Sequence, residues 1–308
     1  MSDLELDQFF FDESILKEDL KELSLKGLTE GKHIRSRLLL LTGQMLEINS
    51  QELFPLGRIV EMVHNATLTH DDVIDNSHTR RGHPSIPNLI NNKKSVLLGD
   101  YMLARALHEL SDFQKPKLTQ ELTYTLKELV EGEWIQYENT NPYKISLKLY
   151  ETLALKKTGS LFRWAFVAPM HLTQENDKLY KHLQEFGEKL GIIFQMSDDI
   201  IDFNPASQKT YGLDFKNNNM NFVLLFLGKS HPELSKKFLQ MDDLAELSSA
   251  EQEYLSDAVK TAKLEMKIHL DRCKDLAEQI KKELSLSESS APYIELCTLL
   301  DLITERVF

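Results

Sequence analysis

Residues His64–Gly82 read His-Asn-Ala-Thr-Leu-Thr-His-Asp-Asp-Val-Ile-Asp-Asn-Ser-His-Thr-Arg-Arg-Gly. The first half of this stretch has the apolar spacing of a helix, and the second half ends in a basic turn. Asp71, Asp72 and Asp75 stand at positions i, i+1 and i+4, which places the first and third on one helix face and the second at its edge. Carboxylates this close repel one another unless a cation neutralises them, and Mg²⁺ prefers such oxygen ligands. The stretch therefore predicts a helix that ends at a magnesium site.

Two arginines follow this first acidic triplet. Arg80 and Arg81 carry guanidinium groups, which match the oxygens of a phosphate. Acid, metal and arginine together indicate a site for a polyphosphate. A solvated acidic helix end followed by a basic loop fits the same residues, and one triplet does not decide between the two interpretations.

A second acidic triplet decides in favour of the metal site. Gln195–Asp202 reads Gln-Met-Ser-Asp-Asp-Ile-Ile-Asp, so Asp198, Asp199 and Asp202 repeat the spacing of the first triplet after an apolar helical segment. An acidic triplet that closes an apolar helix is poorly explained as mere surface. Two such triplets fit a site in which they face each other across a cavity and hold a diphosphate through bridging Mg²⁺.

Further motifs accompany the triplets along the chain. In order, they are Gly31-Lys32-x-x-Arg35, His64 with Asp71–Asp75, Arg80-Arg81-Gly82, Gly99-Asp100-Tyr101, Lys157-Thr158-Gly159, Gln195 with Asp198–Asp202, and Lys209 to Asp214. With this ordered set, the chain resembles the trans-isoprenyl diphosphate synthases (polyprenyl synthetases), most closely their long-chain, octaprenyl-type members. The resemblance covers nearly the whole chain.

The fold predicted from the pattern is all-α. Long segments with helical periodicity alternate with breaks at Gly, Pro and Asn, irregular stretches are expected at 77–90 and 204–221, and no strands are expected. A first amphipathic helix is expected over 3–24. We predict one domain over residues 1–308, a bundle of long helices around a central active-site cavity, which the resemblance identifies as the isoprenoid synthase fold.

Composition excludes several classes of protein. The formal net charge of −12 argues against a nucleic-acid partner, and two isolated cysteines make neither a disulfide framework nor a zinc site. The N-terminal residues lack the features of a signal peptide, and the longest aliphatic run is far too short for a transmembrane segment. We expect a cytoplasmic protein.

The resemblance implies a Mg²⁺-dependent head-to-tail prenyltransferase. It would add isopentenyl diphosphate units to an allylic diphosphate, such as farnesyl or geranylgeranyl diphosphate, with three Mg²⁺ ions when substrate is bound. The all-trans product would be medium to long, like octaprenyl diphosphate, and the protein a homodimer. The alternative product class is short, farnesyl or geranylgeranyl diphosphate.

The resemblance also implies roles for individual residues. Ligands of Mg²⁺ would be Asp71, Asp72, Asp75, Asp198 and Asp199, with Asp202 binding directly or through water. The allylic diphosphate would be bound by Arg80 and Lys157, with Lys209 and Lys216 nearby; isopentenyl diphosphate would be bound without metal by Lys32, Arg35, His64 and Arg81. Thr158 and Gln195 would direct oxygens at the allylic cation.

Small residues before the first triplet bear on product length. Thr67 and Ala66, four and five residues before Asp71, lie about one 5.4 Å turn below the metal on a helix. Val63 and Met62 come next and are apolar, so we expect a tunnel for the growing chain along this helix. We expect other helices to set the floor of the tunnel, near Trp134, which the spacing does not determine.

The chain departs from the family pattern after Asp214 and at one earlier position. Asn218-Asn219 stands where the family usually has Gly-Lys, which puts the affinity for the allylic diphosphate in doubt, and Ser36 replaces a common proline. Other interpretations are a terpene cyclase, a regulatory subunit of a heteromeric synthase, and an HD-type phosphohydrolase that uses His70-Asp71 with His33.

Overall fold

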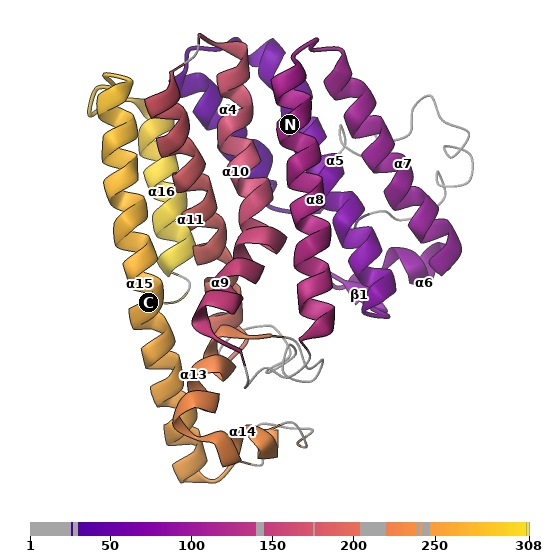
Figure 1. The fold of residues 1–308 in the computed structure, drawn as a ribbon, viewed down its shortest axis with the longest axis vertical. Helices are drawn as coiled ribbons and strands as arrows, with labels where there is room; N and C mark the ends of the chain where they lie inside the picture. The colour runs from indigo at the N-terminus through magenta and orange to yellow at the C-terminus, as the bar shows by residue number, and fades with distance from the viewer. Residues whose placement is uncertain are drawn as a thin grey trace. The chain divides into compact units, whose positions relative to one another are not determined.

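The computed structural model describes residues 26, 30–139, 145–174, 176–203, 220–238, 241, 247–305 and 307. Nearly all regular structure in these residues is helical, as predicted (Figure 1). The contacts divide the chain into two compact units, of which the first takes in the residues up to Gln120 with His171–Thr173. The single domain over 1–308 stays a prediction. The helix expected over 3–24 lies outside the described residues, as do Lys209, Lys216 and Asn218-Asn219.

The first unit is built on one long helix, α5, which packs against both α4 and α7 (Figure 1). Asn49 caps α5 by accepting a hydrogen bond from the amide of Gln51 at 2.9 Å. A Cβ on Gly43 would lie 2.3 Å from Leu53, so the glycine lets α4 approach α5 closely. The elements are α4 (Ile34–Met45), α5 (Ser50–Ile74), β1 (Thr79–Arg80), β2 (His83–Pro84), α6 (Ile86–Ile90), α7 (Asn92–Ser111) and the beginning of α8 (Pro116–Glu138).

The β1–β2 hairpin corrects the expectation that the chain has no strands. Its strands are two residues each, and Thr79 pairs with Pro84 and Arg80 with His83. Strands this short leave no alternating pattern in a sequence. They lie inside the irregular stretch predicted for 77–90, together with the short helix α6.

The second unit is organised around α11, which packs against α10, α15 and α16 (Figure 1). Two glycines on α11 allow backbone to meet backbone: a Cβ on Gly191 would lie 2.4 Å from the Cα of Gly159, and one on Gly187 would lie 2.7 Å from the Cα of Arg163. The remaining elements are α9 (Leu147–Ala154), η1 (Leu155–Gly159), α10 (Ser160–Val167), η2 (Ala168–Leu172), α11 (Asp177–Ile201), α13 (Phe222–Ser230), α14 (Pro232–Phe238), α15 (Ser249–Glu283) and α16 (Ala291–Glu305).

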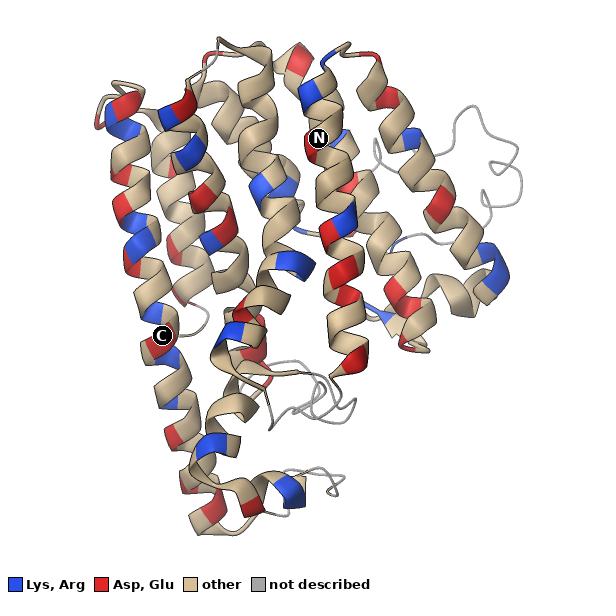
Figure 2. Cartoon of the chain, viewed as in Figure 1, with Lys and Arg blue, Asp and Glu red and all other residues tan. Residues whose placement is uncertain are grey.

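The long helix α15 carries both signs of charge along its length, as Figure 2 shows. A capping box of Ser248 and Glu251 begins it, and ion pairs such as Lys260 with Asp257 lie on its surface. The apolar face of the helix includes the fully buried Met266 and Leu276. None of the helices in the described residues is both long enough and apolar enough to cross a membrane.

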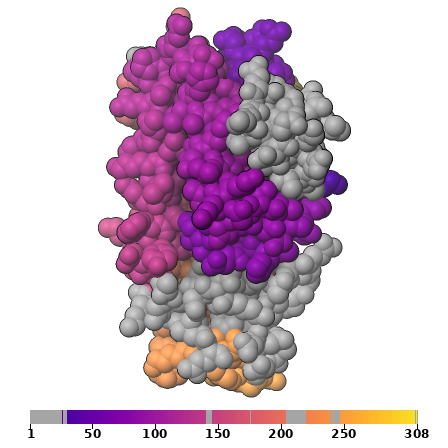
Figure 3. Space-filling model, turned by 90° about the vertical axis from the view of Figure 1, so that its right-hand side faces the viewer, coloured from indigo at the N-terminus to yellow at the C-terminus, as the bar shows by residue number. Residues whose placement is uncertain are grey.

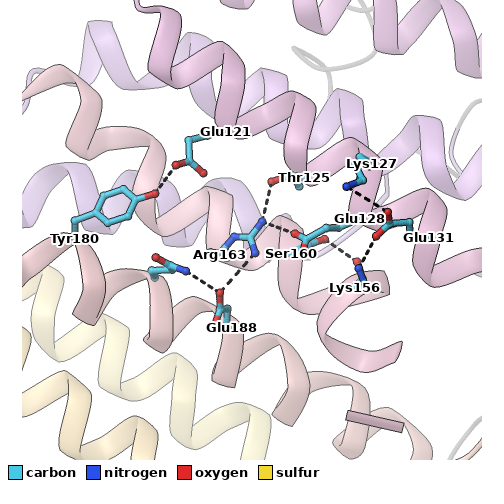
Figure 4. Close-up of polar contacts among 11 residues, drawn as sticks. Glu121, Thr125, Lys127, Glu128, Glu131, Lys156, Ser160, Arg163, Tyr180 and Glu188 are labelled. Carbon is cyan, nitrogen blue, oxygen red and sulfur yellow. Dashed lines mark hydrogen bonds and ion pairs between the residues drawn. The ribbon is translucent and has the colours of Figure 1, made fainter. Parts of the chain in front are cut away.

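A buried polar network joins α8, α10 and α11 within the second unit (Figure 4). Arg163, 5% exposed, donates to Glu128 and pairs with Glu188 at 3.5 Å, while its guanidinium carbon lies 5.4 Å from the ring centre of Tyr124. Burial lowers the pKa of Arg163, but the hydrogen bond to Glu128 and the neighbouring carboxylates outweigh this and raise it. The network holds α10 against α8. It thereby also holds η1, the helical turn that immediately precedes α10.

Candidate active site

The first acidic triplet closes α5, and its three members differ in exposure. Asp75 is exposed, Asp71 is half-buried, and Asp72 is completely buried. Oδ1 of Asp72 accepts hydrogen bonds from Nε of Arg80 at 2.8 Å and from its Nη2 at 2.6 Å. The buried Oδ2 of Asp72 has no hydrogen-bond partner. A buried carboxylate oxygen without a donor, beside two further carboxylates, suits a divalent cation with oxygen ligands.

The hairpin after α5 sends its two arginines in different directions. Arg81 and Gly82 form the two-residue turn, with φ angles of 53° and 78°, the left-handed backbone that such hairpins require. Arg80 therefore points back to Asp72, while Nη1 of Arg81 donates to the carbonyl oxygen of Glu30 at 2.7 Å. The predicted separation of the two side chains is present in the structure; which substrate each binds stays a prediction.

Arg81 joins the other basic residues that the sequence singled out. A Cβ on Gly31 would lie 2.8 Å from its Nη1, so the guanidinium group of Arg81 packs closely against Gly31. Nη1 of Arg35 lies 3.2 Å from Nε2 of His64. The exposed Lys32 lies in the turn between Gly31 and α4.

The charge of this cluster sets the protonation of its histidine. Burial, and then the positive charges of Arg35 and Arg81, lower the pKa of His64 well below its ordinary value. His64 is therefore neutral at pH 7, and its Nε2 accepts the hydrogen bond of Arg35. Burial and the charge of Arg80 likewise lower the pKa of Arg81. A cluster of cations that disfavour one another's charge is suited to an anion such as a diphosphate.

Glu61 is a residue of this site that sequence reasoning missed. It is 4% exposed, it lies three residues before His64 on α5, and it accepts hydrogen bonds from the amide of Ser36 and from His33. Burial raises its pKa, but the bond with His33, the nearby His64 and the Ser36 amide outweigh this and hold the pKa at about 2. The signal available in the sequence was an acidic residue on the apolar face of a helix.

The second acidic triplet closes α11 and repeats the pattern of the first. Asp198 is half-buried, while Asp199 and Asp202 are buried. Asp199 accepts three hydrogen bonds: from Tyr150 Oη at 2.7 Å, from the amide of Phe222 at 2.8 Å and from Nε2 of Gln195 at 2.9 Å. In both triplets, the second carboxylate is thus engaged by the protein. The roles of all six aspartates as metal ligands stay predictions.

A directed chain of hydrogen bonds runs through Asp199. Thr158 Oγ1 donates to Oε1 of Gln195 at 2.8 Å, and Gln195 in turn donates to Asp199. Because an ionised carboxylate only accepts, this chain sets the orientation of the Gln195 amide. The oxygen of Gln195, expected to face the allylic cation, faces Thr158 here; the role toward the cation stays a prediction.

Lys157 and Thr158 lie in the π-helical turn η1 between α9 and α10. A π turn changes the helical register, and such turns are frequent at functional sites. Nζ of Lys157 lies 2.7 Å from Glu133 and 2.9 Å from Oε1 of Gln136, both on α8. Gly132 permits this approach, since a Cβ there would lie 2.8 Å from the backbone nitrogen of Lys157. Lys156 pairs with Glu131 beside it (Figure 4).

The residues predicted to control product length lie on the buried part of α5. Met62, Val63 and Ala66 are at most 2% exposed, and Oγ1 of half-buried Thr67 donates to the carbonyl oxygen of His64 at 2.8 Å. A tunnel beside them stays a prediction. Trp134, near which the tunnel floor is expected, is 67% exposed on α8 in the single chain, and the position of the floor stays a prediction.

The phosphohydrolase interpretation required His33, His70 and Asp71 to share a metal. Instead, His33 contacts Glu61, and Nε2 of His70 lies 3.2 Å from the carbonyl oxygen of Val96 on α7, packed against Gly99. Among the residues that the structure describes, no three His, Cys, Asp or Glu side chains are grouped for a metal by themselves. A metal held by the acidic triplets would therefore need oxygens from a phosphate or water.

Comparison with known proteins identifies the family. The polyprenyl synthetase family profile matches residues 17–261. The chain belongs to the polyprenyl synthetase family. A prenyl transferase of Synechocystis sp. is 30% identical over 289 residues, which cover 90% of this chain and 86% of that protein. The predicted resemblance is thus confirmed.

Two further relatives extend the comparison. The decaprenyl-diphosphate synthase of Dictyostelium discoideum is 34% identical over 226 residues, 70% of this chain but 49% of that protein, so this chain spans about half its length. The crystal structure of a polyprenyl synthase from Caulobacter crescentus, complexed with calcium and isoprenyl diphosphate, superimposes with a TM-score of 0.78 at 24% identity, covering 99% of this chain and 95% of that one. The fold is the all-α isoprenoid synthase fold, as predicted.

Proposed function

We propose that the protein is a Mg²⁺-dependent trans-polyprenyl diphosphate synthase. It would add isopentenyl diphosphate to an allylic diphosphate, farnesyl or geranylgeranyl diphosphate, and release an all-trans product of about octaprenyl length. Family membership and the long-chain relatives support the class of reaction and product. The calcium and isoprenyl diphosphate with which the Caulobacter protein is complexed support a divalent metal and a diphosphate ligand.

One observation carries the proposal: the two adjacent arginines of the hairpin contact two clusters of residues of opposite charge. Arg80 binds Asp72 of the acidic triplet, whereas Arg81 extends to Glu30 and Gly31, beside Arg35 and His64. One subsite is thus acidic and suits a diphosphate that arrives with metal. The other is basic and suits a diphosphate without metal.

The residues divide the work of the reaction as follows. Metal bound at the acidic triplets would neutralise the diphosphate that leaves the allylic substrate. Arg80 and Lys157 would bind that diphosphate, while Arg35, His64, Arg81 and Lys32 would hold isopentenyl diphosphate in place for attack through its double bond. Asp72 keeps Arg80 in place, and the chain from Thr158 through Gln195 to Asp199 fixes the polar side chains nearest the second triplet.

A radiolabelled assay tests the proposed activity. The full chain is incubated with labelled isopentenyl diphosphate, farnesyl diphosphate and Mg²⁺, and the dephosphorylated products are separated by chromatography. We expect label in products of about octaprenyl length, and none in the presence of EDTA. Label confined to farnesyl or geranylgeranyl length would show a short-chain synthase, and unlabelled cyclic products a terpene cyclase. A chain active only with a second subunit would be a regulatory component.

We also propose that the protein is a homodimer, with α8 in the interface. Val130, Trp134 and Tyr137 follow one another along α8 at helical spacing and are 67%, 67% and 71% exposed. Figure 3 shows α8, in magenta, as a long strip of the surface. Sedimentation equilibrium of the wild type and of Trp134→Glu tests this proposal. We expect the wild type to be a dimer and the variant to be a monomer, and a monomeric wild type would contradict the proposal.

A further inference from the structure

The buried carboxylate of Glu61 connects two helices. From α5, its Oε1 accepts a hydrogen bond from the backbone amide of Ser36 at 3.0 Å, and its Oε2 lies 3.4 Å from Nδ1 of His33. Ser36 is itself buried, at 8% exposure. Both oxygens of Glu61 are thus used at the same place, the beginning of α4.

The beginning of α4 needs such a partner. The residue before the helix, His33, has φ 43° and ψ 43° and makes no side-chain capping bond. Ser36 is the third residue of the helix, so its amide has no acceptor within the helix. Glu61 supplies the missing acceptor and a negative charge where the helix dipole favours one.

This bond requires a residue with a backbone amide hydrogen at position 36. Ser36 supplies that hydrogen, whereas a proline at the same position would have none to donate.

The anchored segment carries the basic residues of the metal-free subsite. Lys32 immediately precedes His33, and Arg35 immediately precedes Ser36. Nη1 of Arg35 contacts His64, which stands one helical turn after Glu61 on α5. Glu61 thus holds the two segments that must stay in register for Arg35 and His64 to meet.

We propose that Glu61 is a positioning residue for the metal-free diphosphate subsite of Arg35, His64 and Arg81. This inference rests on the proposed function, in which that subsite binds isopentenyl diphosphate. Glu61 contacts His33 and Ser36, the sequence neighbours of Lys32 and Arg35, and acts through them. It fixes the segment of Lys32 and His33 and the first turn of α4, so that the guanidinium group of Arg35 and the imidazole of His64 converge.

A role of Glu61 through its charge and a role through its position predict opposite effects of substitution on diphosphate binding. A carboxylate close to an anion site repels the anion, so if Glu61 acted through its charge alone, removing the charge would tighten binding. If it acts by position, shortening the side chain weakens binding even though the charge remains. Glu61→Gln keeps the reach and loses the charge, and Glu61→Asp keeps the charge and loses the reach.

The experiment measures inorganic diphosphate binding to the full chain by calorimetry in EDTA, which does not require turnover. We expect Glu61→Asp to bind about tenfold more weakly than wild type and Glu61→Gln to stay within about threefold. The steady-state counterpart is a raised KM for isopentenyl diphosphate with kcat and the allylic KM little changed. Wild-type affinity in folded Glu61→Asp, or tighter binding by Glu61→Gln, would overturn the proposal.

Controls locate the probe and separate this inference from the proposed function. Arg35→Ala and Arg81→Ala should abolish diphosphate binding, and failure of both to do so overturns the subsite. Glu109→Asp is the matched control, since this half-buried carboxylate binds Arg58 and Arg105 and should leave affinity unchanged. Normal diphosphate binding by a chain that forms no prenyl product would disprove the proposed function and leave the role of Glu61 intact.

If Glu61→Asp does not fold, hydrogen exchange of the Ser36 amide in the wild-type chain replaces it. A positioned first turn should exchange more slowly when diphosphate binds, because the ligand stabilises the arrangement that Glu61 holds. An exchange rate that diphosphate leaves unchanged would overturn the proposal.

Discussion

Oη of Tyr150 donates a 2.7 Å hydrogen bond to Oδ2 of Asp199, the middle carboxylate of the second acidic triplet. Both residues are 1% exposed, and the Tyr150 ring stacks on Phe222 with 4.9 Å between ring centres. The amide of Phe222 donates to the same oxygen of Asp199. Helices α9, α11 and α13 therefore meet at one aspartate.

We expect Tyr150→Phe to lower the free energy of unfolding by about 1–2 kcal/mol, because a buried donor to a carboxylate is lost while the ring packing remains. Turnover should fall about tenfold, with the KM for isopentenyl diphosphate unchanged. Urea unfolding and steady-state kinetics measure the two effects. Tyr293→Phe is the control, since its hydroxyl donates to Glu278 on α15; equal effects of both variants on turnover would contradict the assignment.

Substitutions of different aspartates within an acidic triplet should change the free energy of unfolding by different amounts. Asp198→Asn and Asp71→Asn remove half-buried carboxylates, so we expect small changes in the free energy of unfolding and a loss of turnover by orders of magnitude. Asp199→Asn replaces one of the two oxygens that accept these three hydrogen bonds by an amide nitrogen that only donates, and should cost about 2–4 kcal/mol as well. Near-wild-type turnover in folded Asp71→Asn or Asp198→Asn would refute the metal assignment.

The two arginines of the hairpin turn should act on different substrates. Arg81→Ala should mainly raise the KM for isopentenyl diphosphate, and Arg80→Ala that for the allylic diphosphate, because their side chains leave the turn in different directions. Arg80→Ala should also destabilise the fold, since it leaves the buried Asp72 carboxylate without its partner. Steady-state kinetics, with each substrate varied in turn, measure these KM values. If both variants raise the KM for the same substrate equally, the assignment is wrong.

A larger side chain at Ala66 should shorten the product. Ala66 is fully buried on α5, so Ala66→Phe should cost about 1–3 kcal/mol of stability and place a ring across the predicted tunnel. We expect products of geranylgeranyl length or less, with the first condensation largely kept, by chromatography of dephosphorylated products. Ala106→Phe on α7, also fully buried, controls for overpacking; unchanged product length in Ala66→Phe would place the tunnel elsewhere.

The lowered pKa of Glu61 predicts a pH dependence of stability. Its pKa falls from 4.5 to about 2 on folding, so its contribution is present above pH 4.5 and is lost as the pH falls toward 2. The shift corresponds to about 3 kcal/mol. The difference in free energy of unfolding between wild type and Glu61→Gln should therefore shrink between about pH 5 and pH 3. Urea unfolding at both pH values measures it, and a constant difference would contradict the prediction.

The helical fold class and the two acidic triplets could be predicted from the amino-acid sequence alone. Helical periodicity and the i, i+1, i+4 spacing are local properties, and each triplet does lie at the end of a long helix, α5 or α11. The divergence of Arg80 and Arg81 was also predictable, because it follows from a short turn. The two-residue strands of the hairpin were not, because they are too short to leave a pattern.

The polar groups that hold the site residues in place became visible only in the folded chain. Arg81 meets Glu30 across 51 positions of the sequence, Tyr150 meets Asp199 across 49, and Ser36 meets Glu61 across 25. A buried donor or acceptor must find a partner, but no local pattern states which one, because the partner lies far away in the sequence and only the packing of the elements brings the two groups together. The sequence predicted which residues would carry the chemistry, whereas only the packing of the helices revealed that Glu61 contacts His33 and Ser36 and that Tyr150 contacts Asp199.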